Sequence, residues 1–317
     1  MAATLDSAGA LALRRNIYAK PSVTRTDLTN LLALGRAAGS AAPKEYADLL
    51  SAVAVDLLVN QADPTKYITQ ADADWLVAQL GQSGGLSCRA EFEMLVDVLR
   101  YAVSVPASLT AFAVGEIETA IINGHKAGAG VANHAVGVIT HDDVEALRTT
   151  VFAATDGSSL HVTRASAEAL FRIAHAANGA DNDATFDDFF AKAIGNYLMG
   201  IAHRWTPSVA DELEREKWLD EKTPSFGAFL GGIFRGLSEK HADVDLESKI
   251  KAENEADAQD LARAGAAVDP DETNWLLAHL TRDGPVTSAE KSLLRFLKQE
   301  APVLQPALTA MMEREAA

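Results

Sequence analysis

A helix–turn–helix pattern that recurs along the chain is the feature that most constrains its fold. Residues 275–297 have the pattern of an apolar-faced helix, an Asp-Gly turn, a Thr-x-x-Glu cap and a second apolar-faced helix. Residues 75–99 have the same helix–turn–helix order with Gly84-Gly85 in place of the Asp-Gly turn, and residues 147–173 have a looser version. Units of this kind bury their apolar faces against neighbouring units. We therefore expect an array of helical units.

Apolar side chains recur at three- and four-residue steps, which is the spacing of amphipathic helices. No stretch shows a convincing alternation of the kind that marks a strand. Aromatic residues make up only 6% of the chain, and Ala and Leu are abundant. This composition suits close packing between helices better than sheets, which favour β-branched and aromatic residues. The predicted fold class is all-α.

Internal matches indicate how the units are arranged. Residues 68–72 (ITQAD) match residues 139–143 (ITHDD), and the sequence VTR occurs at both 23–25 and 162–164. We predict repeated three-helix units of roughly 50–60 residues. The expected order is a partial unit (20–62), two full units (66–123 and 138–200), a divergent stretch (201–268) and a final unit (269–315).

The spacing of these matches also suggests an internal duplication, either compact or solenoid-like. It predicts one helical lobe at residues 1–130 and a second at 131–317, the second interrupted by the divergent insertion 201–268. Stacked units can share a core, so the lobes are expected either as separate domains or as one continuous body.

Charge and composition limit the classes of function. The net charge of −16 disfavours general binding to nucleic acid or to anionic lipid, because like charges repel. The only cysteine, Cys88, excludes an intrachain disulfide and suits a reducing compartment. No run approaches the ~18 apolar residues of a membrane span, and the N-terminal basic pair follows its apolar run, unlike a secretory signal. We expect a cytoplasmic protein with no membrane span.

The Asp-Gly turns allow two interpretations. Asp283–Glu290 coincides with the second half of an EF-hand loop, but the earlier ligand positions fall on His279 and Thr281. A glycine turn followed by a capping box of Thr287 and Glu290 explains the same residues. We favour capping and retain a cation site as the alternative.

Similar capping patterns open other predicted helices, at Thr24/Asp27, Thr69/Asp72 and Thr140/Asp143. Asp181 and Asp183 lie in the densest acidic cluster, before a helix expected to start near Thr185. An acidic loop that caps this helix is the favoured interpretation, and a low-affinity Ca²⁺ or Mg²⁺ site is the alternative.

The Asp-Gly turn between short helices resembles the repeats of the TerB-like tellurite-resistance family and, more distantly, EF-hands. The resemblance lies at 283–290, with fragments at 83–91 and 156–168, and extends to bacterial multi-unit helical proteins. It implies a divalent-cation (Ca²⁺ or Mg²⁺) binding or sensing protein of the stress-response type. The candidate metal ligands are Asp156, Asp181, Asp183, Asp283 and Glu290.

Residues 223–240 break the repeat pattern. Four glycines within this segment lower its intrinsic helicity, each by about 1 kcal/mol relative to alanine. Such a weak helix needs a packing surface, which would be the protein's own core, another protein or second copy, or a membrane. Its apolar face consists of Phe226, Phe229, Leu230, Ile233, Phe234 and Leu237.

From these observations we predict a non-enzymatic binding or scaffold protein whose insertion at 220–262 binds a protein partner or a second copy. The rival hypothesis is the divalent-cation protein, and calorimetric titration with Ca²⁺ and Mg²⁺ separates the two. No catalytic residues are predicted and no cofactor other than the possible cation, because no nucleophile–base–acid arrangement is evident. An enzyme is the third hypothesis.

Overall fold

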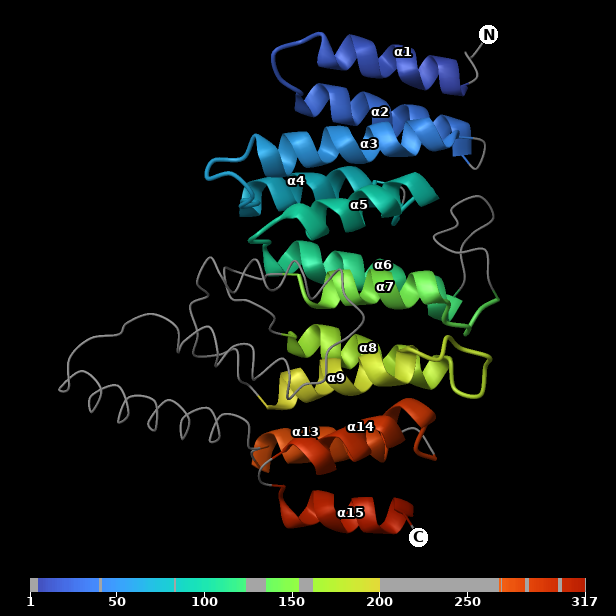
Figure 1. The fold of residues 1–317 in the computed structure, drawn as a ribbon, viewed down its shortest axis with the longest axis vertical. Helices are drawn as coiled ribbons and strands as arrows, with labels where there is room; N and C mark the ends of the chain where they lie inside the picture. Colours follow the sequence, from blue (N-terminus) through green and yellow to red (C-terminus); the bar gives the residue numbers. More distant parts are fainter. Residues whose placement is uncertain are drawn as a thin grey trace, which may run out of the picture. The chain divides into compact units, whose positions relative to one another are not determined.

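The computed structural model describes residues 5–39, 42–82, 84–123, 135–153, 162–199, 268, 270–282, 285–301 and 304–316. Within these residues, the regular elements are twelve α-helices and one π-helix, with no β-strand (Figure 1). An isolated β-bridge joins Tyr67 and Ser104. The predicted all-α class is confirmed. No helix in this part of the chain is long and apolar enough to cross a membrane.

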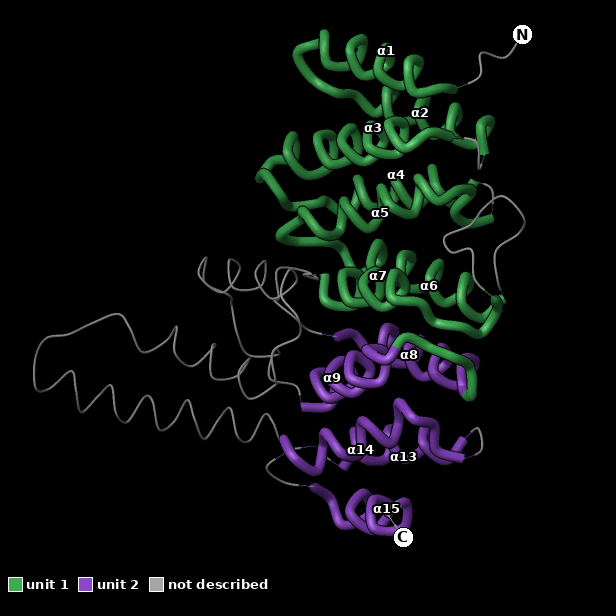
Figure 2. Tube along the Cα trace, turned by 45° about the vertical axis from the view of Figure 1, so that its right-hand side comes forward, with its two compact units in different colours: residues 1–157, 179–183 green, residues 158–178, 184–317 purple. Residues whose placement is uncertain are grey.

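The chain divides into two compact units, coloured green and purple in Figure 2. Unit 1 comprises residues 1–157 and 179–183, and unit 2 comprises residues 158–178 and 184–317. The predicted lobes describe duplicated sequence, which need not coincide with compact units, so their boundary at residue 130 stays a prediction. The predicted insertion, except Val268, lies outside the described residues.

Unit 1 is built around two helices, α3 and α5. Helix α3 contacts α1, α2 and α5, and it continues into the π-helix η2. Helix α5 also contacts α7, and α6 contacts both α4 and α7. The elements are α1 (Ser7–Tyr18), α2 (Arg25–Ala38), α3 (Lys44–Val55), η2 (Asp56–Asn60), α4 (Gln70–Gly81), α5 (Arg89–Tyr101), α6 (Ala107–Asn123) and α7 (His141–Val151).

Unit 2 has its most extensive helix contact between α9 and α14, and α8 also packs on α9. Phe171 of α8 makes edge-on ring contacts with Phe190 of α9 and with Trp275 of α13, at centroid distances of 5.1 and 5.6 Å. The helices are α8 (Arg164–Ala176), α9 (Phe186–Leu198), α13 (Pro270–Leu280), α14 (Ser288–Glu300) and α15 (Pro306–Ala316).

Threonine caps begin the helices that the sequence marked. In α2, α7 and α14 the threonine hydroxyl accepts from the backbone N–H three residues on, and the acid there accepts from the threonine N–H. Each box satisfies N–H groups that have no partner inside the helix. These predicted boxes are confirmed. They are Thr24 with Asp27, Thr140 with Asp143, and Thr287 with Glu290. Thr69 likewise accepts from the Asp72 N–H at the start of α4.

Two glycines allow helices to approach closely, one in each unit. A Cβ atom at Gly35 of α2 would overlap the ring of Tyr46, a fully buried residue of α3. A Cβ atom at Gly195 of α9 would overlap the Phe296 ring of α14. Because rings and backbones of packed helices have little room to move, neither position has space for a side chain.

We expect Gly35→Ala and Gly195→Ala each to lower the free energy of unfolding by about 1–3 kcal/mol, the cost of overpacking. Gly115→Ala in α6 is the matched control, because nothing lies within 4 Å of the added methyl. Since alanine favours a helix interior over glycine, the control should gain up to ~1 kcal/mol. Urea unfolding followed by circular dichroism measures all three. A stabilised Gly35→Ala or Gly195→Ala variant would contradict the close approach.

Candidate functional site

Most of the sequence-predicted site residues lie outside the described part of the chain. This applies to the entire apolar face of residues 223–240 and to two candidate metal ligands. The residues concerned are Phe226, Phe229, Leu230, Ile233, Phe234, Leu237, Asp156 and Asp283. Their predicted roles stay predictions.

Asp181 and Asp183 belong to a loop that is tied to the start of α7. The Asp183 backbone N–H donates to the Ile139 carbonyl (2.8 Å), and the Ile139 N–H donates to Asn182 Oδ1 (2.9 Å). His141 Nδ1 lies 3.5 Å from Asp183 Oδ2. Among the described residues no three His, Cys, Asp or Glu side chains form a group suited to a metal ion. The contacts support a structural role for this loop, and the cation hypothesis stays a prediction.

A groove on unit 1 is the best candidate for a functional site. It has a volume of about 680 Å³ and is lined by residues of α1, α3, α5 and α7 and by Asp56, the first residue of η2. Helices α3 and α5 pack side by side, α1 packs on α3, and α7 packs on α5. We call this surface the α3–α5 groove. A concavity of this volume is in the range of known ligand sites.

We call the parts of α3 and α5 that line the groove its floor, and both helices contribute apolar side chains to it. Helix α3 contributes Ala47, Ala52 and Val55, and α5 contributes Phe92 and Val96. Phe92 and Val96 are buried. The small side chains of α3 leave the floor open to an incoming apolar group.

Tyrosine and arginine side chains surround this floor. Tyr18 and Tyr101 are 41% and 55% exposed, so both side chains are accessible to a partner. The Tyr18 hydroxyl donates to Asp56 Oδ2 (2.5 Å), and the Arg14 guanidinium lies 5.7 Å from the centre of the Tyr18 ring. Burial, followed by the hydrogen bond to Asp56, raises the pKa of Tyr18 to about 12. Tyr18 is therefore a neutral, oriented ring at physiological pH.

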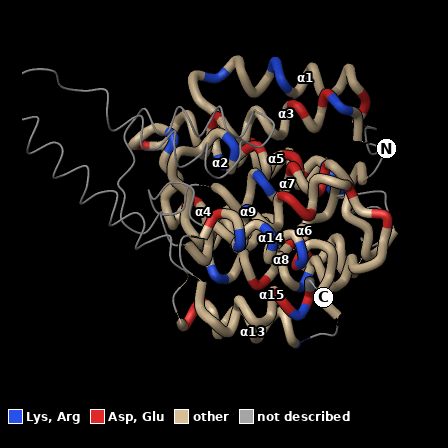
Figure 3. The backbone as a smooth tube through the Cα atoms, turned by 60° about the horizontal axis from the view of Figure 1, so that its bottom comes forward, with Lys and Arg blue, Asp and Glu red and all other residues tan. Residues whose placement is uncertain are grey.

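The charge of the lining is predominantly negative. Six carboxylates and three guanidiniums line the groove, and Figure 3 marks acidic stretches on α3, α5 and α7. Arg89 is already paired, with its Nε 2.8 Å from Glu93 Oε1 and its Nη2 3.5 Å from Asp142 Oδ2. The lining residues at charged positions are Arg14, Asp48, Asp56, Arg89, Glu93, Asp97, Arg100, Asp142 and Glu145.

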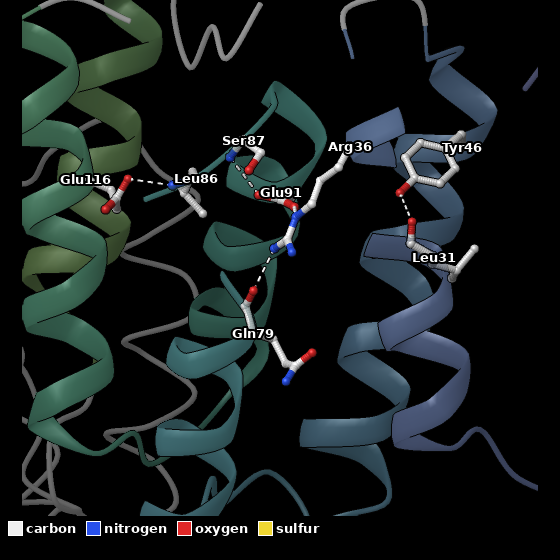
Figure 4. Close-up of polar contacts among 8 residues, drawn as sticks. All are labelled: Leu31, Arg36, Tyr46, Gln79, Leu86, Ser87, Glu91 and Glu116. Carbon is white, nitrogen blue, oxygen red and sulfur yellow. Dashed lines mark hydrogen bonds and ion pairs between the residues drawn. The ribbon is translucent and has the colours of Figure 1, made fainter. Parts of the chain in front are cut away.

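A buried polar network sets the position of α5 beside this groove (Figure 4). Glu91, at the third position of α5, is fully buried. Its Oε2 accepts from the Ser87 backbone N–H (2.7 Å), and its Oε1 accepts from Arg36 Nε (2.7 Å). Arg36, from α2, also donates to the Gln79 carbonyl at the end of α4 (2.6 Å). One glutamate and one arginine thus join three helices.

The pKa of Glu91 shows that burial outweighs the hydrogen bonds to its carboxylate. Burial raises it, while the Ser87 N–H and the Arg36 guanidinium lower it without cancelling the increase. Burial likewise raises the pKa of the neighbouring Cys88 thiol, which favours the unreactive thiol form. The Ser87 N–H and Arg36 therefore offset part of the cost of burying the Glu91 carboxylate.

Glu290 occupies a similar environment in unit 2. It is fully buried at the third position of α14, and its Oε2 accepts from the Thr287 N–H (2.7 Å). Its Oε1 lies 3.2 Å from His175 Nε2, in the last turn of α8. When the two VTR sequences at 23–25 and 162–164 are aligned, Arg36 aligns with His175. Glu290 thus closes the capping box of α14 and lies beside His175. Its role as a metal ligand stays a prediction, as does the duplication.

Sequence reasoning did not identify the residues of the groove. Tyr18 and Tyr101 end separate helices 83 positions apart, and Asp48 and Asp97 resemble ordinary exposed acids of amphipathic helices. The only hint of the groove in the sequence is that these tyrosines lie outside the apolar stripes. That position does not show that the two tyrosines share a surface. Comparison with known protein families, curated proteins and solved structures finds no match.

We expect Arg36→Ala to lower the free energy of unfolding by about 3–5 kcal/mol at pH 7, because Glu91 is left as an unpaired buried charge. Arg36 lowers the Glu91 pKa, so its removal raises that pKa further. The loss should therefore be smallest below pH 4.5, where Glu91 is protonated in both folded and unfolded chains, and should grow as the pH rises. Urea titrations from pH 4 to 8 measure this.

The control is Arg100→Ala, which removes an exposed arginine from the last turn of α5. It should cost less than ~1 kcal/mol at every pH. An Arg36→Ala loss that is equal at pH 4 and pH 8 would show that packing of the side chain, and not its charge, stabilises the unit.

Proposed function

We propose that the protein is a non-enzymatic helical binding or scaffold protein that holds a segment of a partner protein in the α3–α5 groove. The observation that supports this most directly is the groove itself, whose lining combines apolar side chains with exposed aromatic and charged ones. Protein interfaces combine the same kinds of side chain.

The residue types of the lining add to this support. Tyrosine and arginine are the residues that most often dominate binding energy at protein interfaces. Tyr18 and Tyr101 offer large exposed rings from two helices, and Arg14 and Arg100 lie in the same lining. The hydrogen bond to Asp56 orients Tyr18 before any partner arrives. Such preorganisation lowers the entropy that binding must remove.

A photo-crosslinking amino acid, p-benzoylphenylalanine, placed at Ser51 on the floor of the groove tests this proposal in cells. We expect a crosslinked partner from Ser51 but none from Asn30, an exposed residue of α2 outside the groove. The Ala52→Trp change, which fills part of the floor, should abolish the Ser51 product because it occupies the space of the partner. Equal products from Ser51 and Asn30, or none from Ser51, would refute groove binding.

The insertion at 220–262 is proposed as a second contact with partners, on the basis of the apolar face of residues 223–240. Deleting 223–240 should remove proteins from the set that co-purifies with the native chain, because that face is lost. Quantitative mass spectrometry compares the two sets, and circular dichroism verifies that the shortened chain still folds. An unchanged set from a folded variant would contradict a binding role for this segment.

A further inference from the structure

The α3–α5 groove is lined entirely by residues of helical elements. Its floor is a pair of helices of 12 and 13 residues, which are about 18–20 Å long at 1.5 Å per residue. Its sides, α1 and α7, are helices too, each packed on one helix of the floor. A helix of about three turns would therefore meet helical surfaces on every side, and a helix in an apolar groove is an established mode of peptide recognition.

The α3 side of the floor favours close approach of a helix. Ala47, Ser51 and Val55 are four residues apart and so share one face of α3, with Ala52 beside them. The distance between packed helices is set by the side chains at their contact, and small ones allow it to shorten. Phe92 and Val96 line the α5 side of the floor and are only 5% and 7% exposed, so most of the accessible floor comes from α3. An apolar stripe on the incoming helix would fit this floor.

The charges around the floor select the sign of the partner. The Asp48 and Asp97 side chains make no hydrogen bond or ion pair with another described residue, although both line the groove. Carboxylates in the lining outnumber guanidiniums two to one, and the whole chain has a net charge of −16. Complementary charge accelerates association and excludes partners of the wrong sign.

From these features we infer that the α3–α5 groove binds a basic amphipathic helix of a partner protein. The inference rests on the proposed function and specifies its partner: an apolar stripe faces Ala52 and Phe92, and Lys or Arg side chains flank it toward Asp48 and Asp97. Tyr101, which is 55% exposed, also offers an aromatic ring to the partner's cations, which adds cation–π attraction.

Two labelled 18-residue helical peptides test this inference by fluorescence anisotropy. Both have the same leucine and alanine stripe, and the remaining positions are lysine in one peptide and glutamate in the other. We expect the lysine peptide to bind at least ~10-fold more tightly, with an affinity that falls as salt rises because its charge pairs are at the rim. Equal binding of the two peptides would overturn the inference.

Charge variants distinguish the groove from general attraction to an acidic protein. Asp48→Lys with Asp97→Lys should weaken binding of the lysine peptide at least ~10-fold, since two attractive contacts become repulsive. Asp74→Lys with Glu313→Lys makes the same change in net charge at exposed sites outside the groove, and should weaken it by less than ~3-fold. Equal losses in folded variants would overturn the inference.

The Ser51 crosslink distinguishes a failure of this inference from a failure of the proposed function. Mass spectrometry of the crosslinked peptide gives the sequence of the occupant. A basic amphipathic segment of another protein supports the inference. An acidic segment, a second copy of this chain or its own residues 223–240 would overturn it, while an acidic partner segment would leave groove binding intact.

Discussion

A buried glutamate at the start of a helix, whose carboxylate must be stabilised inside the protein, is the constraint that both units share. Transfer of a carboxylate into a protein interior is unfavourable unless hydrogen bonds and an opposite charge compensate it. Glu91 and Glu290 each accept a backbone N–H at the beginning of a helix, and each faces a cationic or protonatable side chain, Arg36 and His175 respectively. The partner in each case comes from the last turn of another helix in the same unit. The start of one helix is therefore fixed to the end of another.

In unit 1 this constraint extends to the groove. Glu91 and Phe92 are adjacent on α5, so a bond network that fixes Glu91 also fixes the floor residue beside it. Helix α3 is held on the other side, where Tyr46 inserts against Gly35 and its hydroxyl donates to the Leu31 carbonyl (2.6 Å). The buried hydroxyl is satisfied, as the interior requires. The two helices of the floor are thus positioned by polar contacts on their buried sides, which leaves their other sides to form the groove.

The groove also indicates what some of the acidic side chains of the chain do. Several of its acids act locally: Asp27, Asp143 and Glu290 close capping boxes, and Glu93 and Asp142 pair with Arg89. Asp48 and Asp97 have no such local partner and share a surface with two exposed tyrosines. Acids that are not needed for folding, next to rings that remain exposed at a cost in free energy, are typical of a binding surface.

The sequence by itself determined the all-α class and the helix starts, because a capping box and an amphipathic stripe depend on residues three or four positions apart. Thr24 and Asp27 specify α2 wherever the helix packs. The sequence also indicated the repeated pattern, but not which of its acids are paired. Only the tertiary structure decided that Arg36 meets Glu91, 55 residues away, and that Tyr18, Asp48, Asp97 and Tyr101 line one groove. Such pairs form through the packing of whole helices, whose relative placement depends on contacts distributed over many residues, and local spacing does not encode it.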